Sequence, residues 1–249
     1  PLRCNSHTSI GVPNGHDRQC YVHNRTNRLE ICAKVRFLLI LFRSDTIALG
    51  STLPCSREVR ALLQQLREAV WVLVQSSLSN RLLSLLRPAD FALLEPHLDP
   101  VKLDVNKSVV PANKPIEYAY FLESGIVSVV ASRADSQSIE VGIYGREGMG
   151  GFPLLLGSDQ SPHDQYIQLA GAGYRIKTSP FLRAVHQSPN LSTLLLRYVH
   201  AFTTQTAQTA LANGSSHIDE RLARWLLMCH DRIDGDVLPL THRFLSMML

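Results

Sequence analysis

The 249-residue sequence has no apolar run long enough to cross a lipid bilayer. No run exceeds six residues, the length of Phe37–Phe42 between Arg36 and Arg43, whereas a transmembrane helix needs about 20. The sequence also has no targeting pattern of a basic start, an apolar block and a small-residue cleavage site. From these absences we expect no membrane span and a cytoplasmic location.

Cysteine is scarce and scattered. The five cysteines, at positions 4, 20, 32, 55 and 229, form no C-x-x-C pair, so we expect no disulfide framework and no zinc or iron–sulfur site. The β-rich segment described below holds one histidine, His163, too few for the ligands of a metal-binding jelly-roll enzyme. Cys229 lies on the apolar face of a predicted helix, where a small core residue is expected. We therefore expect a non-enzyme without metal or cofactor.

The excess of positive over negative charge is confined to the front of the chain. Residues 1–75 carry 10 Lys and Arg against 5 Asp and Glu, whereas residues 76–249 carry 15 against 16. The net charge of +4 is therefore no sign of a nucleic-acid-binding surface that extends over the whole chain.

The first 75 residues differ in pattern from the rest. Residues 1–55 show no sustained hydrophobic periodicity, so we expect this segment to be poorly ordered. Apolar residues within 56–74 recur at spacings of three and four, which predicts an amphipathic helix. Short helices are predicted over 80–86 and 88–94, the second beginning with proline, which a first turn tolerates.

Short β-rich runs alternate with turn residues between Val101 and Lys177, a spacing typical of a compact antiparallel sandwich. The predicted strands are 101–105, 116–122, 126–131, 139–144, 166–170 and 174–177. A jelly roll is the simplest architecture that fits this spacing of strands. With the helices on either side it makes an α+β fold.

Residues 190–212 carry a stripe at the a and d spacing of a coiled-coil seam for three heptads. The stripe comprises Leu191, Leu194, Tyr198, Ala201, Gln205, Gln208 and Ala212. This pattern predicts a long helix that pairs with its copy in a homodimer. The alternative is a helix packed on its own sandwich, because three heptads is the shortest repeat that supports a coiled coil.

A small helical domain is predicted after this helix. Asn213–Ser216 should end the long helix and cap the next one, which carries one apolar face. That face comprises Ile218, Leu222, Trp225, Leu226 and Cys229. A turn at 234–236 and a short extended piece lead to Thr241, which is predicted to cap a helix over 242–249.

Two stretches, Val141–Met149 and Leu238–Leu249, give this order of elements a resemblance to the Crp/Fnr family of bacterial transcription regulators. The resemblance covers residues 76–249 and leaves 1–75 as an unmatched N-terminal extension. It implies a sensor jelly roll over 76–189, a dimerisation helix over 190–213 and an incomplete winged helix-turn-helix over 214–249. It also implies a homodimer that senses a small molecule and binds DNA.

The nucleotide-binding residues of that family are missing. Its cyclic-nucleotide-binding members hold the ribose hydroxyl with a Gly-Glu pair and the phosphate with an Arg-Ser/Thr pair. The corresponding places here read Gly150-Gly151 and Pro162–Gln165, so we do not expect cyclic AMP to bind. The resemblance gives Gly150, Gly151, His163 and Gln165 as candidates for the lining of an effector pocket.

The glycines at 145, 148, 150 and 151 also suggest a phosphate-binding loop. No Lys-Ser/Thr pair follows them, and no strand–turn–helix pattern surrounds them. A tight turn between strands is the favoured interpretation.

Thr241, His242 and Arg243 match the start of the first helix of the family's helix-turn-helix, where side chains contact DNA phosphates. Bases are read by the second helix, which in the family follows the position of Leu249. Residues 1–249 are therefore expected to bind DNA weakly at best and without sequence preference. Two functions stay open: a DNA-binding regulator with a degenerate sensor, and a ligand-binding or interaction module without specific DNA binding.

Limited proteolysis tests the expected disorder of the front segment. We expect the first cleavages within residues 1–55, leaving a resistant core that starts between about 56 and 80, because an unpacked backbone fits a protease site. Mass spectrometry of the fragments locates the cuts. Protection of the whole front segment would contradict the expectation.

Overall fold

The computed structural model describes residues 75, 77–133, 137–238 and 245. The predicted helix over 56–74, the other expectations for residues 1–74, and the predicted phosphate contacts Thr241, His242 and Arg243 lie outside the described residues. Among the helices that are described, none is long and apolar enough to span a membrane.

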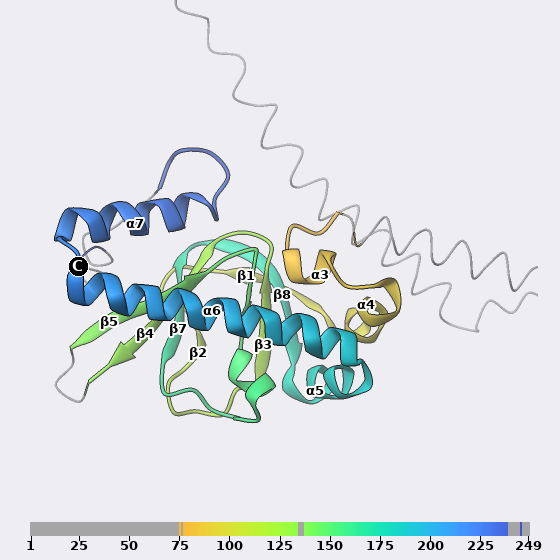
Figure 1. Cartoon of the computed structure of the whole chain (residues 1–249). Helices are drawn as coiled ribbons and strands as arrows, with labels where there is room; N and C mark the ends of the chain where they lie inside the picture. The colour runs from red at the N-terminus through yellow and green to blue at the C-terminus, as the bar shows by residue number, and fades with distance from the viewer. Residues whose placement is uncertain (1–74, 76, 134–136, 239–244, 246–249) are drawn as a thin grey trace, which may run out of the picture. The chain divides into compact units, whose positions relative to one another are not determined.

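Eight antiparallel strands form the two sheets of the predicted jelly roll (Figure 1). Sheet A has the order β1 (Asp99–Leu103), β8 (Gly171–Lys177), β3 (Tyr118–Leu122) and β6 (Met149–Gly150). Sheet B has the order β2 (Ser108–Val110), β7 (Asp164–Leu169), β4 (Ile126–Ser132) and β5 (Ser138–Tyr144). The α+β prediction is confirmed. Strands β2 and β6 were not predicted because three and two residues are too few to show a period.

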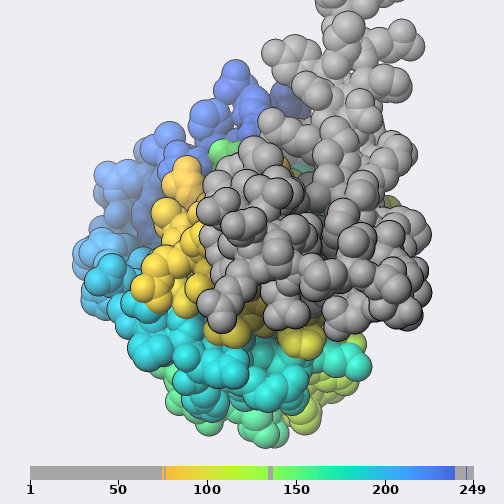
Figure 2. Space-filling view, turned by 90° about the vertical axis from the view of Figure 1, so that its right-hand side faces the viewer, coloured from red at the N-terminus to blue at the C-terminus, as the bar shows by residue number. Residues whose placement is uncertain are grey.

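Helices precede and follow the sandwich. They are α3 (Arg81–Ser84), α4 (Pro88–Leu94), α5 (Thr178–Gln187), α6 (Pro189–Ser215) and α7 (Ile218–His230), with 3-10 turns η1 (Glu95–His97) and η2 (Phe152–Leu156). The surface view shows α3 and α4, in orange and yellow, next to the cyan helices α5 and α6 (Figure 2). The α4 carboxylate of Asp90 accepts a 2.6 Å hydrogen bond from Ser188, the residue that caps α6.

The boundary between α6 and α7 differs from the prediction. Helix α6 continues through Gly214 to Ser215, although glycine costs about 1 kcal/mol in a helix. Arg221 of α7 donates a 3.1 Å hydrogen bond to Asn213 of α6, a contact across the boundary that local propensity does not reveal. The residue that caps α7 is His217, whose N–H donates to the Glu220 carboxylate at 3.0 Å.

The two faces of sheet B are buried in different clusters. Val127 and Val129 of β4 belong to the main core inside the sandwich, which also includes residues of sheet A, α5 and α6. Ile126, one position earlier, belongs to a second cluster with Trp225 and Cys229 of α7. Because side chains alternate along a strand, β4 faces the sandwich interior on one side and α7 on the other.

Candidate functional site

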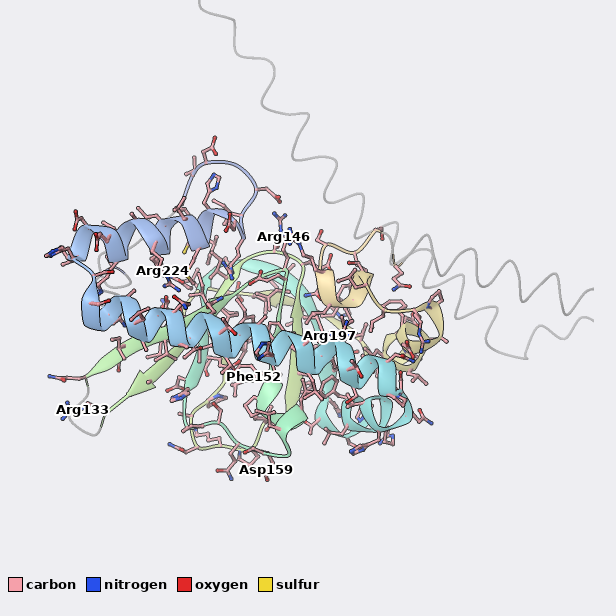
Figure 3. The ribbon with its side chains drawn as sticks, viewed as in Figure 1. Arg133, Arg146, Phe152, Asp159, Arg197 and Arg224 are labelled. Carbon is pink, nitrogen blue, oxygen red and sulfur yellow. The ribbon has the colours of Figure 1, made fainter. Side chains whose placement is uncertain are left out.

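An aromatic cluster occupies the junction between the sandwich and α6. Its members are Tyr144 of β5, Phe152 of η2, and Tyr198 and Phe202 of α6 (Figure 3 labels Phe152). The ring centroid of Phe202 lies 4.8 Å from that of Phe152, 6.4 Å from that of Tyr144 and 6.3 Å from that of Tyr198. These separations are typical of packed aromatic pairs, so side chains of the protein itself fill the junction.

Two glycines allow α6 to approach the sandwich closely. A Cβ atom on Gly142 would lie 2.9 Å from the Phe202 ring, and one on Gly148 would lie 2.7 Å from the Tyr198 ring. The Tyr198 hydroxyl donates a 3.0 Å hydrogen bond to the Met149 carbonyl, and burial raises the pKa of that phenol. Both aromatic rings therefore need glycine opposite them.

One member of the aromatic cluster, Tyr144, also forms a polar pair with Gln165. The Tyr144 hydroxyl donates to Gln165 Oε1 at 3.0 Å, and both side chains are fully buried. Burial holds the pKa of Tyr144 well above its usual value, so the phenol acts as a donor. Gln165 Nε2 has no hydrogen-bond partner among the described residues. A Cβ atom on Gly150 would collide with the Tyr144 hydroxyl.

The structure brings together part of the predicted effector-pocket set. Gly150 and Gln165 both contact Tyr144. Gly151 has a φ of 78°, and a Cβ there would lie 3.0 Å from the Tyr118 carbonyl oxygen, so the backbone requires glycine at this position. His163 lies in a turn where its N–H donates to Ser161 Oγ at 3.1 Å.

The turn predicted at the clustered glycines is present. Gly148 N–H donates to the Gly145 carbonyl at 3.1 Å, which closes the connection from β5 of sheet B to β6 of sheet A. Sequence reasoning found these glycines but missed that Gly148 faces the Tyr198 ring of α6 and that Gly150 faces the Tyr144 hydroxyl. The aromatic residues at 198 and 202, four residues apart on one predicted helix, were the available signal.

Most of the predicted dimer stripe contacts the protein's own sandwich. Leu191 and Tyr198 are buried in the main core, and Leu194 packs against it. The Gln205 side chain accepts a 2.9 Å hydrogen bond from Ile143 N–H of β5. Ala201 and Gln208 are exposed. The alternative of a helix packed on its own sandwich therefore describes one face of α6, and the dimer stays a prediction.

Helix α7 is docked on the outer face of sheet B. Trp225 and Cys229 pack with Ile126 and Ile143 in the second apolar cluster, and Cys229 is buried as predicted. Burial is the main cause that raises the pKa of this thiol to about 12, which excludes a thiolate nucleophile at neutral pH.

Two ion pairs hold the end of α7 and the following turn to the β5–β6 connection. Arg232 lies 2.7 Å from Glu147, and Arg146 lies 2.8 Å from Asp234 (Figure 3 labels Arg146). The Glu147 carboxylate also accepts from Gly145 N–H at 3.2 Å. The contact between α7 and the sandwich thus combines an apolar centre with charged pairs at one end.

No protein-family model and no curated protein matches the sequence. Solved structures do match. The c-di-GMP-responsive global regulator CLP of Xanthomonas campestris is 15% identical, with a TM-score of 0.51 over 65% of this chain and 84% of that one. FixK2 of Bradyrhizobium japonicum is 15% identical, with a TM-score of 0.53 over 61% and 77%. A transcriptional regulator of the Crp/Fnr family from Eubacterium rectale is 13% identical, with a TM-score of 0.57 over 68% and 79%.

These likenesses define the class of fold. The chain has a Crp/Fnr-type fold, and in it a jelly roll is followed by a long helix and a further helical segment. The fold predicted from the two sequence stretches is thereby confirmed.

Proposed function

We propose that the protein is a homodimeric, DNA-binding transcription regulator of the Crp/Fnr type. The observation that carries the proposal is the order of elements: a jelly roll, a 27-residue helix packed along it and a second docked helix. The overall similarity to solved regulators of this fold supports it. We assign residues 76–189 to the sensor, 190–213 to the dimer helix and 214–249 to the start of a winged helix-turn-helix. The buried Cys229 thiol and the side chains that fill the junction favour a non-enzyme.

The dimer is proposed to form through the outward face of α6. Residues on this face recur at spacings of three and four and are all exposed: Thr193, Leu196, His200, Thr203, Ala207, Ala210 and Gly214. Leu196 keeps 42% of its surface exposed, and the adjacent Leu211 keeps 61%. Small residues let two helices approach closely, and the heptad spacing keeps the seam facing a partner. The opposite face of α6 is already used by the sandwich.

The sensor is proposed to be degenerate. The space between β5, η2 and α6 is occupied by the aromatic cluster, and the side chains nearest to a Cβ atom placed on Gly150 are those of Tyr144 and Gln165. Neither residue supplies a carboxylate for ribose hydroxyls or a guanidinium for a phosphate. Any effector would therefore differ chemically from a cyclic nucleotide or bind elsewhere.

Light scattering tests the dimer. We expect the wild-type protein to have twice the mass of one chain, and Leu196→Glu combined with Ala207→Glu to be monomeric because like charges would face each other across the seam. Ala201→Glu combined with Gln208→Glu is the matched control, since it adds the same two charges at exposed positions of α6 off this face. A double variant that stays dimeric, or a monomeric control, would remove the outward face from the proposal.

Calorimetry tests the degenerate sensor. We expect no heat of binding with cyclic AMP at millimolar concentration, because its phosphate and ribose hydroxyls would lose water without gaining strong partners. Phe202→Ala makes room at the junction and should still not bind, which separates missing charge from missing space. Micromolar affinity in the wild-type protein would refute the degenerate sensor.

Selection of duplexes from a random pool tests DNA binding. The product of the complete gene, whatever its length, should enrich two-fold symmetric sites with half-sites about 34–36 Å apart, the spacing of two reading heads on one side of the double helix. Measured at two salt concentrations, the affinity for the enriched duplexes should fall as salt rises. If the complete product enriches no sequence, the interaction-module alternative replaces the regulator.

A further inference from the structure

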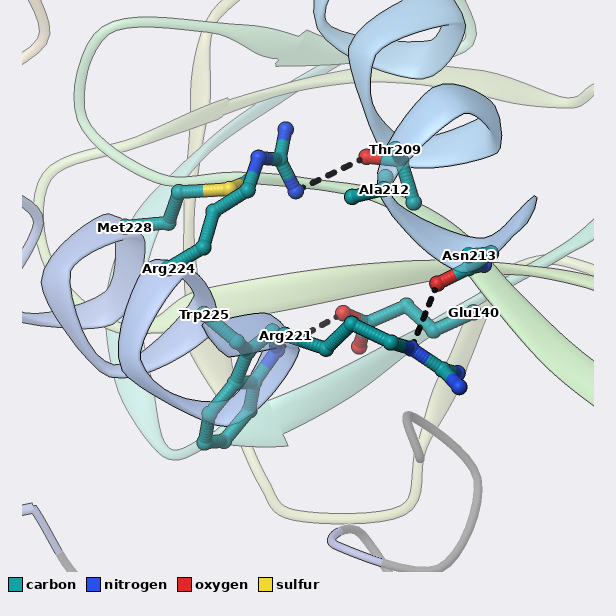
Figure 4. Close-up of a pocket in the computed structure, with 9 residues that line it drawn as sticks. Glu140, Thr209, Ala212, Asn213, Arg221, Arg224, Trp225 and Met228 are labelled. Carbon is teal, nitrogen blue, oxygen red and sulfur yellow. Dashed lines mark hydrogen bonds between the residues drawn. The ribbon is translucent and has the colours of Figure 1, made fainter. Parts of the chain in front are cut away.

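A bulge in β5 places an acidic side chain under α7. Val129 of β4 pairs with Gly142, but Val130 pairs with Glu140, so Val141 is an additional residue in β5. An extra residue reverses the inside–outside alternation that follows it. Glu140 consequently shares the outer face of sheet B with Ser128 and points toward Trp225 of α7 (Figure 4).

Glu140 is the centre of a buried hydrogen-bonded network that joins three strands to α7. The Trp225 indole N–H donates to Glu140 Oε1 at 2.8 Å. Ser128 Oγ lies 2.6 Å from Glu140 Oε2 and 2.9 Å from Gln168 Oε1. All four side chains are buried, with Glu140 only 7% exposed. An ionised carboxylate in such a place is costly unless it is paired.

Counting protons favours the neutral acid. Ser128 has one hydroxyl proton, yet its oxygen faces two acceptor atoms, Glu140 Oε2 and Gln168 Oε1. If Glu140 is protonated, it donates to Ser128 Oγ, and Ser128 donates to Gln168. If Glu140 is ionised, it takes the serine proton, and the Gln168 amide must turn so that Nε2 donates to Ser128 Oγ. In the structure Gln168 Oε1 faces Ser128 and Nε2 has no partner among the described residues, which is the orientation that suits the neutral acid.

We propose that the proton on Glu140 acts as a latch that holds α7 against the sandwich, so that loss of this proton weakens the docking of α7. The proposal concerns only the docking of α7 on the sandwich, so it can be tested in the absence of DNA and independently of the proposed regulator function. If α7 begins the DNA-binding unit, as proposed above, the same proton would influence where that unit lies relative to the sensor.

The groups around Glu140 set the pH range over which it loses its proton. Burial raises the pKa of Glu140 from 4.5 to about 7, while the bonds from Ser128 and Trp225 and the more distant charge of Arg232 lower it in part. Arg232 is itself paired with Glu147. A cleft adjoins Glu140, and Arg221 and Arg224 of α7 line it. The Cys229 thiol of the same helix, with its pKa raised to about 12, stays neutral.

The α6 side of that cleft carries no ionisable group among its lining residues. It contributes Thr209, Ala212 and Asn213, of which Thr209 accepts a 3.2 Å hydrogen bond from Arg224 and Asn213 a 3.1 Å bond from Arg221 (Figure 4). Because the pKa of Glu140 is raised in the docked state, its contribution to docking is full below about pH 4.5 and is lost as pH rises to about 7.

Nuclear magnetic resonance and hydrogen exchange test the latch in the full chain. The Trp225 indole N–H reports on the bond to Glu140, and Trp71→Phe leaves it as the single indole signal, since the chain has 2 tryptophans. We expect this signal to titrate with a midpoint near 7, and α7 to lose about tenfold of its exchange protection between pH 6 and pH 8, after correction for intrinsic rates.

Glu140→Gln is the decisive variant, because its amide can accept from Trp225 and donate to Ser128 at every pH. It should abolish both pH effects, and its protection should be the same at pH 6 and pH 8 and no lower than that of the wild-type protein at pH 6. His217 and His230 are retained in this variant, so a titration that survives it belongs to another group and overturns the proposal. Glu147→Gln removes a different carboxylate from the same contact and should leave the pH dependence in place. Exchange protection of α7 that is equal at pH 6 and pH 8 in the wild-type protein would also overturn the proposal.

Discussion

Strand β5 is the constraint on which the arrangement of both long helices depends. It lies at the edge of sheet B, where unpaired backbone groups invite aggregation unless they are covered. The protein covers it twice. Gln205 of α6 accepts from Ile143 N–H on the open edge, and Gly142 makes room for Phe202. On the other face, Ile143 packs with Trp225 of α7. One strand therefore positions the helix of the proposed dimer and the helix that begins the proposed DNA-binding unit.

The periodic parts of the fold were predictable because they repeat. Six strands and the helices around them follow from alternation or from spacings of three and four, and Pro88 marks the start of α4 at the predicted residue. The site was less predictable because it depends on exceptions to period. The additional residue Val141 reverses the direction of Glu140, so a charged side chain that alternation assigns to one face lies on the other. A bulge leaves no signal in the residues themselves.

Helix α6 shows why a heptad pattern alone does not identify which face of a helix meets a partner. Its inward face carries Leu191, Leu195, Tyr198 and Phe202, which are buried against the sandwich. Its outward face carries small residues and Leu196 at the same three-and-four spacing. Both faces satisfy the pattern, and the larger side chains dominated the prediction. Side-chain size identifies the face that packs inside the chain, and the exposed residues mark the face that we propose for a partner.

The filled junction changes how such a fold can be regulated. A ligand shifts an equilibrium only if it binds one arrangement better than the other, and at this junction Phe152 and Phe202 already make the contact between sandwich and α6. Contacts between side chains of the chain itself therefore hold α6 against the sandwich at this junction. The contact of α7 is different, because its apolar centre is small and its polar centre, Glu140, has a pKa of about 7. A control point therefore lies more naturally at α7 than at the junction, where the contacts of the described residues with α6 include aromatic rings and the Tyr198 hydroxyl.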